Sequence, residues 1–364
     1  MTNMHDLNEI ESLCGYDQGT FASGKTVIIL ENGSVKYIDL NLEFPSMVTM
    51  NISGRATAMS VSNDFSILAI AIEDNKNAKI SIFSLDASIE EEKTTYGAQY
   101  LPSEICISQA AEIVAGLSVL EEQVHVQTFD VKDGTRNCVG NIMTETDAKK
   151  WQLSFCPADE GVLCALGGNF AYLLRASSGD IENFSSIALQ DVICHDWAND
   201  VNILFGSRLG YLHIYRETIL LDVVNIKTLA ENELKNSANL EIISVRSTSS
   251  KFTCQTNTGV ILLFDSNSES GPQWNSCRTF IISDFELRPY HFLSFDFTNE
   301  ILLYDCGNTL RTISIQNLSK SNSFSGDVVS FRHCVEVICI RANDKLIVTL
   351  DAKGYFAVFS KFTK

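Results

Sequence analysis

The sequence is poor in proline, with five in 364 residues, and in basic side chains, with 27 Lys and Arg against 45 Asp and Glu. So few prolines, together with only 20 glycines, exclude a collagen-like chain or one dominated by flexible linkers. The net charge of -18 repels phosphate groups, so we expect neither nucleic acid nor a membrane as a partner. The hydrophobic share of 45% supplies a large core and excludes a mostly disordered chain.

Long hydrophobic segments are missing as well. The most notable apolar run, residues 67–72, is far shorter than the roughly 20 residues that cross a bilayer as a helix. The first ten residues lack the basic and apolar regions of a secretory signal. We therefore expect a soluble protein of the cytoplasm. Its eleven cysteines, an odd number, then stay reduced and behave mostly as small buried hydrophobes, as Cys164, Cys254 and Cys339 do in their apolar settings.

A repeat of strands and turns runs through the chain. Each copy has an apolar strand, a short polar turn, a second apolar strand, a tight turn and a third strand. Residues 58–70 form the clearest copy, and six more follow at 105–117, 153–165, 193–205, 243–255, 293–304 and 338–349. The tight turns are spaced by about 46 residues, centred near Asn32, Asn75, Glu121, Gly168, Arg208, Asn257, Gly307 and Lys353. This is the period of a propeller blade built from four short antiparallel strands.

The residue pattern within the repeat supports strands rather than helices. Apolar and polar residues alternate in the third strands, as in residues 80–83, 124–127, 211–215 and 355–359. Asn32-Gly33 is typical of the type I′ turn that joins two strands of a hairpin. Phe129-Asp130 and Phe264-Asp265 keep the aromatic–Asp pair that often ends a WD-repeat blade, whereas the preceding Gly-His dipeptide is missing. We predict an all-β chain, a WD-repeat-like β-propeller with seven or eight degenerate four-stranded blades.

The repeat also predicts how the chain is organised. A single propeller spans residues 1–364. The first hairpin, residues 24–40, has no clear strand of the same type before it. Residues 1–45 are therefore predicted to close the ring by pairing with the last copy, 335–359, which would remove open sheet edges. Residues 226–237 contain helix formers, with apolar Leu229 and Leu234, and predict a short helical insertion between blades.

Candidates for metal binding or catalysis are few. No pair of histidines has the His-Glu-x-x-His spacing and no Cys-x-x-Cys pair is present. Cys194-His195-Asp196 and His333-Cys334 have metal-binding residue types, but neighbours on one strand point to alternate faces and do not converge on one ion. The sequence therefore predicts no metal, cofactor or catalytic residue. The six histidines are His5, His125, His195, His213, His291 and His333.

Four further segments suggest a site only at first sight. Cys156 follows an apolar strand and has no basic neighbour to activate its thiol, so we interpret it as structural. Gly167-Gly168-Asn169 opens a strand rather than a helix, which favours a hairpin turn over a phosphate-binding loop. Residues 266–274 only faintly resemble the Asp-box turn of sialidase propellers, and the acidic residues 90–92 are typical of an exposed loop. The interaction surface remains unassigned by the sequence.

Three segments together carry a family resemblance. They are the hairpin 24–37, the strand 151–157 with its turn at 166–170, and the strand 194–197 leading into 204–215. Together they resemble the N-terminal propeller of the cilia- and flagella-associated WD-repeat proteins. The resemblance implies a non-enzymatic scaffold of the ciliary or flagellar axoneme that docks or regulates inner dynein arms. The implied partners are axonemal, dynein-arm or microtubule-associated proteins. Members of that family usually continue into a second propeller and long coiled coils, which this sequence does not contain.

Two other functions compete with this interpretation. The same features fit a generic cytosolic WD-like adaptor in another protein complex. A propeller enzyme would gather polar residues or metal ligands on its innermost strands. The strands at 67–70 and 301–303 are instead apolar, which argues against an enzyme.

Overall fold

The structure is a computed structural model. It describes residues 16–22, 26–31, 33–39, 47–62, 64, 66–85, 92–120, 123–134, 136–143, 151–167, 169–177, 180–198, 201–230, 240–247, 251–258, 260–265, 277–281, 293–296, 301–305, 309–314, 331–332, 337–342, 346–351 and 356–360. Contacts divide the chain into two compact units, within Leu7–Ala188 and Leu189–Lys364, and each is described by itself.

Antiparallel strands make up nearly all of the described structure. Each sheet consists of strands that follow one another in the sequence, so every pairing is made by a local connection. In the described residues, seven sheets have four strands and one has three. The predicted all-β chain is confirmed, with eight sheets in the part of the chain that the structure describes.

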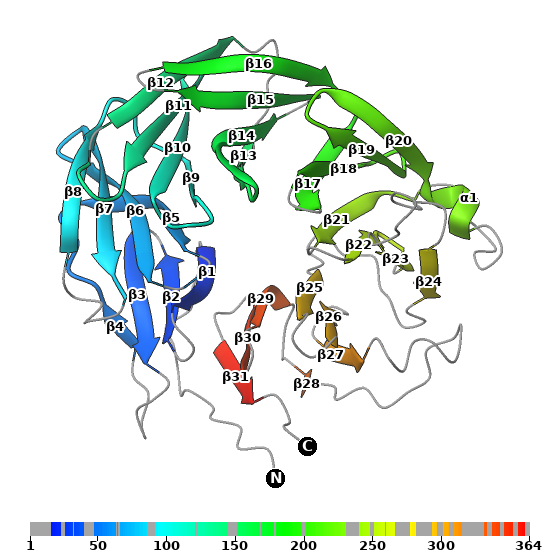
Figure 1. The fold of residues 1–364 in the computed structure, drawn as a ribbon. Helices are drawn as coiled ribbons and strands as arrows, with labels where there is room; N and C mark the ends of the chain where they lie inside the picture. The colour runs from blue at the N-terminus through cyan, green and yellow to red at the C-terminus, as the bar shows by residue number, and fades with distance from the viewer. Residues whose placement is uncertain are drawn as a thin grey trace. The chain divides into compact units, whose positions relative to one another are not determined.

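Four sheets belong to the unit within residues 7–188 (Figure 1). The first contains β1 (Tyr16–Ala22), β2 (Thr26–Glu31), β3 (Ser34–Asp39) and β4 (Met47–Thr49). The second contains β5 (Arg55–Val61), β6 (Ile67–Asp74), β7 (Asn77–Ser84) and β8 (Glu92–Ala98). The third contains β9 (Glu104–Ile107), β10 (Ile113–Leu120), β11 (Gln123–Asp130) and β12 (Arg136–Met143). The fourth contains β13 (Trp151–Cys156), β14 (Asp159–Gly167), β15 (Phe170–Ser177) and β16 (Asp180–Ala188).

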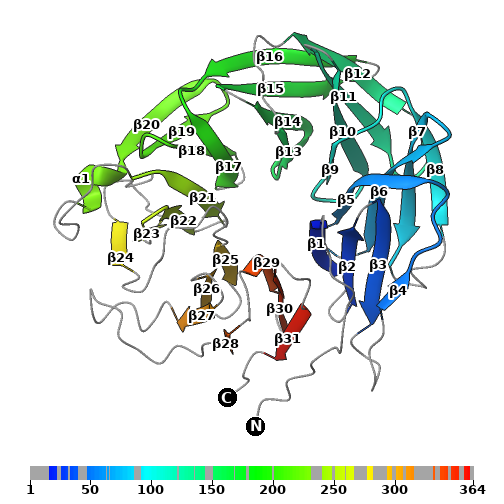
Figure 2. The same cartoon turned by 180° about the vertical axis from the view of Figure 1, so that it is seen from behind.

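Four more sheets belong to the unit within residues 189–364 (Figure 2). The fifth sheet contains β17 (Val192–Ala198), β18 (Asn202–Ser207), β19 (Tyr211–Arg216) and β20 (Ile219–Asn225). The sixth contains β21 (Ile242–Ser247), β22 (Lys251–Thr256), β23 (Val260–Asp265) and β24 (Cys277–Ile281). The seventh contains β25 (Leu293–Asp296), β26 (Ile301–Asp305), β27 (Thr309–Ser314) and β28 (Phe331–Arg332). The eighth contains β29 (Val337–Ala342), β30 (Leu346–Asp351) and β31 (Phe356–Ser360).

The N-terminal hairpin has a strand before it, contrary to the sequence-based expectation. β1 pairs along β2 from Tyr16↔Glu31 to Ala22↔Thr26, and β4 completes a four-stranded sheet. Asp17, Gln18 and Gly19 interrupt the apolar alternation of β1, which explains why the strand was missed. The closure of a ring by residues 1–45 stays a prediction.

Turn chemistry explains two of the tight hairpins. Asn75 and Lys76, between β6 and β7, both have positive φ, at 49° and 71°, as the type I′ turn requires. Gly33, between β2 and β3, has φ of 82°, and a Cβ there would lie 2.4 Å from Cγ of Arg55. Glycine therefore fits this turn for both its backbone and its lack of a side chain.

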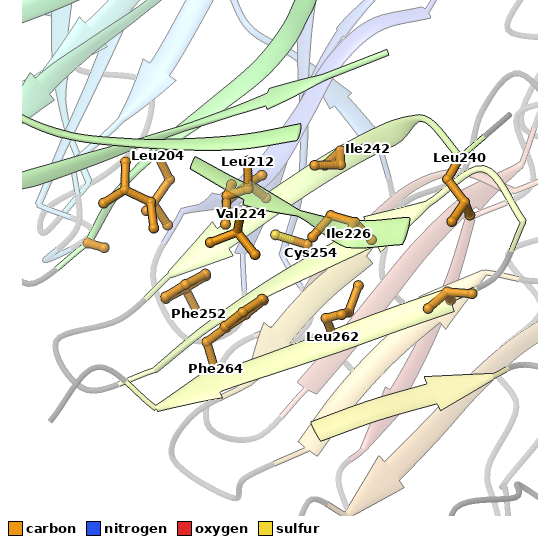
Figure 3. Close-up of a cluster of buried hydrophobic side chains, with 14 residues drawn as sticks. Leu204, Leu212, Val224, Ile226, Leu240, Ile242, Phe252, Cys254, Leu262 and Phe264 are labelled. Carbon is orange, nitrogen blue, oxygen red and sulfur yellow. The ribbon is translucent and has the colours of Figure 1, made fainter. Parts of the chain in front are cut away.

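Apolar side chains on facing sheets form the core. One cluster joins the fifth and sixth sheets, with Leu212, Val224 and Ile226 packed against Phe252 and Phe264 (Figure 3). The rings of Phe252 and Phe264 are stacked with centroids 4.5 Å apart. Similar clusters join the first and second sheets, the second and third sheets, and the third and fourth sheets.

The aromatic–Asp pairs end third strands, as the repeat predicted. Phe129 is fully buried near the end of β11, and its ring stacks on Tyr96 with centroids 6.2 Å apart. Oδ1 of Asp130 accepts hydrogen bonds from the backbone N–H groups of Lys132 and Asp133 in the following turn. The aromatic ring therefore packs between strands while the carboxylate caps the turn.

One short helix, α1 (Ile226–Ala230), follows β20. Oδ1 of Asn225 accepts a hydrogen bond from the N–H of Lys227 at 3.0 Å, which caps the first turn. This helix occupies the first five residues of the predicted insertion 226–237, and residues 231–237 lie outside the described residues. No helix in the described part of the chain is long and apolar enough to span a membrane.

Candidate interaction surface

The most unusual surface in the described residues lies on β20. This strand is the last in its sheet, in the order β17-β18-β19-β20, and no strand among the described residues pairs with its other side. Its side chains Ile219, Leu220, Leu221 and Val223 are exposed by 63%, 47%, 40% and 40% of their surfaces. Four apolar side chains in five positions of an exposed edge strand are a liability for aggregation unless something covers them.

The fourth strands of two other sheets follow the ordinary pattern. On β16 the buried positions Ile181 and Ile187 are apolar, whereas exposed positions carry polar side chains such as Glu182 and Ser186. On β8 Tyr96 is buried, and Glu92, Lys93 and Thr95 are exposed. The exposed apolar residues of β20 are therefore not a general consequence of being the fourth strand.

A bulge and the register of β20 explain how so many of its apolar side chains are exposed. Val224 lies opposite Leu212 and is buried in the cluster between the fifth and sixth sheets. The pairing shifts between Ile214↔Asp222 and Tyr215↔Leu220, so Leu221 is the extra residue of a β-bulge. Only Val224 is then buried among the apolar residues of this strand.

The exposed apolar surface continues onto β19. Cross-strand partners share a face, so Leu220 and Val223 lie on the face of Tyr215 and His213. Tyr211, two residues before His213 on the same face, is 38% exposed, and its ring lies 6.3 Å from the imidazole. We call Tyr211, Ile219, Leu220, Leu221 and Val223 the β20 patch. Burial lowers the pKa of His213, so its ring is neutral at pH 7 and adds no charge to this face.

Few charges interrupt the β20 patch. Asp222 is the one charged side chain on β20, and its Oδ1 accepts a hydrogen bond from the N–H of Val223 at 2.8 Å. Glu217 and Arg216 lie in or beside the hairpin at one end, where the Arg216 Nε donates to Oδ1 of Asn202. Lys227 lies beyond the other end, in α1.

The Cys194-His195-Asp196 segment lies on β17, and its side chains diverge. Oδ2 of Asp196 accepts a hydrogen bond from the backbone N–H of Ser247 on β21, and the Ser247 hydroxyl donates to the carbonyl of Trp197. Cys194 packs against the cluster between the fifth and sixth sheets. The ring of His195 lies instead near Phe205, at 6.2 Å. Among the described residues, no three His, Cys, Asp or Glu side chains gather as a metal site requires.

Burial sets the protonation of these groups. It lowers the pKa of His195 to about 4, with a smaller contribution from the positive charge of Arg246. Burial also raises the pKa of Asp196, although Arg246 and the hydrogen bonds to the carboxylate oppose the rise. The segment therefore acts as a structural link between β17 and β21, with a neutral imidazole.

The other residues that the sequence raised as site candidates lie in structural positions or outside the described residues. Cys156 is buried at the end of β13, and His125 is buried on β11, where its ring stacks on Tyr100. Gly167 at the end of β14 pairs with Phe170 at the start of β15, so the two strands form a hairpin, as expected. Of residues 90–92 the structure describes only Glu92, exposed at the start of β8. His5, His291, His333-Cys334 and the segment 266–274 lie outside the described residues.

The sequence analysis missed the β20 patch. A signal was present, since residues 219–224 read Ile-Leu-Leu-Asp-Val-Val with no alternation of apolar and polar residues. Such a run is equally typical of a strand buried on both faces, so the sequence alone does not separate the two cases.

Consecutive four-stranded antiparallel sheets are typical of the blades of a β-propeller, and this chain is similar in fold to solved WD40 and other propeller structures. The crystal structure of the C-terminal WD40 domain of Sif2 has a TM-score of 0.71 at 9% identity over 99% of both chains. The computationally designed Ika8 protein has a TM-score of 0.63 at 13% identity over 98% of both chains. The β-propeller domain of Cps50 (Swd1) from Myceliophteria thermophila has a TM-score of 0.59 at 12% identity, covering 86% of this chain and 98% of that one. No protein-family model and no curated protein matches the sequence.

Proposed function

We propose that the protein is a non-enzymatic scaffold that binds another protein through the β20 patch. The observation that carries this proposal is the exposure of Ile219, Leu220, Leu221 and Val223 on one edge strand. A contiguous exposed apolar surface often marks an interaction site. The chain also shares its β-propeller fold with WD40 domains.

The chemistry of the described residues supports a binding role over an enzymatic one. Catalytic groups need contact with a substrate and a pKa suited to proton transfer. Of the strongest candidates, His195 is buried and Asp196 is half-buried, with its carboxylate held by a neighbouring strand.

The finer proposal is a place in the ciliary or flagellar axoneme, in the docking or regulation of inner dynein arms. It is supported by the resemblance of three segments to the cilia- and flagella-associated WD-repeat proteins, nearest to cilia- and flagella-associated protein 57. The segments are 24–37, 151–157 with the turn 166–170, and 194–197 leading into 204–215. The alternative is a cytosolic adaptor of the WD type in another complex, which the β20 patch would serve equally well.

Proximity labelling in ciliated cells tests both levels of the proposal. The wild-type chain is compared with the double variant Leu220→Lys and Val223→Lys, which places charges in the β20 patch. The matched control carries Asn183→Lys and Ser186→Lys at exposed positions of β16. We expect the β20 variant, and not the β16 variant, to lose a defined set of labelled proteins. Axonemal proteins in that set support the ciliary proposal, and a cytosolic complex supports the adaptor. An unchanged set for a folded β20 variant would contradict docking through this surface.

A further inference from the structure

We propose that the β20 patch binds an extended, basic segment of its partner, which adds to the fifth sheet as another strand beside β20. This inference rests on the proposed function and specifies the kind of partner. The segment would have apolar residues at alternate positions and Lys or Arg between them.

The distribution of apolar side chains over both faces favours an added strand. Leu220 and Val223 share a face with Tyr215 and His213. Ile219 lies opposite Arg216, the neighbour of Tyr215, and so occupies the other face. A helix lying on one face would leave the exposed side chains of the other face in water. A strand at the edge extends both faces, and its alternating side chains cover both.

The backbone of β20 also offers hydrogen-bonding groups at this edge, because no described strand pairs with its outer side. The N–H of Val223 donates to the carboxylate of Asp222, the preceding residue, at 2.8 Å. The Asp222 carboxylate therefore accepts a hydrogen bond from a backbone N–H that could instead donate to a carbonyl of an added strand. Residues 219–225 are seven in number and would pair with a segment of about the same length.

Charge selects a basic partner and disfavours a second copy of this chain. The protein has a net charge of -18, so two copies repel each other. Asp222 is the only charge within β20, and antiparallel pairing of two β20 strands would bring the two carboxylates to one apolar interface. A Lys or Arg beside Asp222 would instead pair with it, and would be attracted by the acidic surface as a whole.

Selection from a displayed library of random nine-residue peptides tests the proposal on the full chain. The wild type and the Leu220→Lys, Val223→Lys variant are used in parallel, and melting curves confirm that both are folded. We expect the wild type to enrich peptides with alternating apolar residues and interspersed Lys or Arg. The enriched peptides should bind the variant at least about tenfold more weakly. Asp222→Asn, which keeps an acceptor for Val223, should reduce the preference for Lys and Arg while leaving the alternation.

Backbone methylation separates strand addition from other modes of binding. Methyl groups on alternate amide nitrogens of an enriched peptide remove donors on one edge and keep its charges and side chains. We expect methylation of one of the two sets of alternate amides to weaken binding by at least about tenfold, as strand addition requires. Equal binding of the unmodified peptide and both methylated peptides would overturn the proposal. So would enriched peptides with apolar residues at helical spacing, or no enrichment over the variant.

A dimer of the wild type in sedimentation experiments that the double variant abolishes would assign the edge to a second copy and overturn the basic partner. These outcomes leave the proposed function separately testable. Labelled proteins lost with the β20 variant in cells would still show docking at this surface, by a mode other than strand addition.

Discussion

Oδ2 of Asp196 on β17 accepts a hydrogen bond of 2.8 Å from the backbone N–H of Ser247 on β21. The two residues lie 51 positions apart and belong to neighbouring sheets, so this bond joins the first strand of one sheet to the first strand of the next. Oδ1 of the same carboxylate accepts from the N–H of Trp197 at 2.9 Å. One side chain therefore satisfies two backbone donors at this junction.

Removing that acceptor should destabilise the junction. Asp196→Ala leaves the N–H of Ser247 without its partner, and we expect the free energy of unfolding to fall by about 2 kcal/mol. Asp196→Asn keeps an acceptor oxygen and removes a charge from a half-buried position, so its effect should be smaller. Urea unfolding followed by tryptophan fluorescence measures both. Asp180→Ala, at an exposed position of β16, serves as the control and should change stability by less than about 0.5 kcal/mol.

The buried imidazole of His195 should make the protein sensitive to acid. Its pKa is about 4 in the folded chain against an ordinary value of 6.5, so the unfolded chain binds more protons between these values. Stability is therefore full above pH 6.5 and falls as the pH drops toward 4, by an amount on the order of 3 kcal/mol. The raised pKa of Asp196 acts in the opposite direction, because it makes stability fall as pH rises through its titration.

The measurement is the free energy of unfolding against pH for the wild type and for His195→Gln. Both chains are also compared in an Asp196→Asn background, which removes the opposing carboxylate. We expect His195→Gln to flatten the curve between pH 6.5 and 4. A curve equally steep without His195 would show that other groups cause the acid sensitivity.

Gly167, at the end of β14, should tolerate no side chain. A Cβ at this position would lie 2.3 Å from the ring of Trp151, which is buried on the adjacent strand. Gly167→Ala must therefore displace the indole, and we expect a loss of about 2 kcal/mol or more. Gly97 on β8 provides the control, because a Cβ there meets nothing within 4 Å. Equal melting temperatures for the two alanine variants would contradict the argument.

Local features of the fold were predictable from the sequence. Strands pair with their immediate successors, so a hairpin such as Asn75-Lys76 between alternating strands predicts its own pairing. The aromatic–Asp pairs also marked the ends of strands. The last buried position of such a strand takes an aromatic ring, and the next residue supplies a carboxylate that caps the following turn.

Features that depend on position in the sheet were not predictable. β1 was missed because Asp17, Gln18 and Gly19 hide its alternation, and pairing with β2 stabilises it nevertheless. The apolar run in β20 is exposed because the strand lies at an edge and carries a bulge at Leu221. The bond from Ser247 to Asp196 depends on the packing of two separate hairpins, which no local pattern encodes.

The buried cysteines should react slowly with thiol reagents in the native protein. Cys156, Cys164 and Cys254 are buried, and burial raises the pKa of the Cys164 thiol and of Cys194, the latter to about 12. Thiolate is the reactive form. Burial therefore keeps Cys156, Cys164 and Cys254 inaccessible, and the raised pKa keeps the Cys164 thiol protonated at pH 8. Alkylation followed by mass spectrometry should find these peptides unlabelled in the native state and labelled in denaturant. Rapid native labelling of Cys164 would contradict its place in the core.

Val223 and Val224 offer a matched test that separates stability from binding. They are neighbours on β20, but Val223 is 40% exposed whereas Val224 is 5% exposed and packs in the cluster of Figure 3. Val224→Ala removes buried methyl groups, so we expect the free energy of unfolding to fall by about 2 kcal/mol. Val223→Ala should change it by less than about 0.5 kcal/mol. Binding of an enriched basic peptide should show the reverse order, with Val223→Ala weakening it and Val224→Ala leaving it unchanged at temperatures where that variant is folded. If both valines affected stability equally, Val223 would belong to the core, and the β20 patch would lose one of its central members.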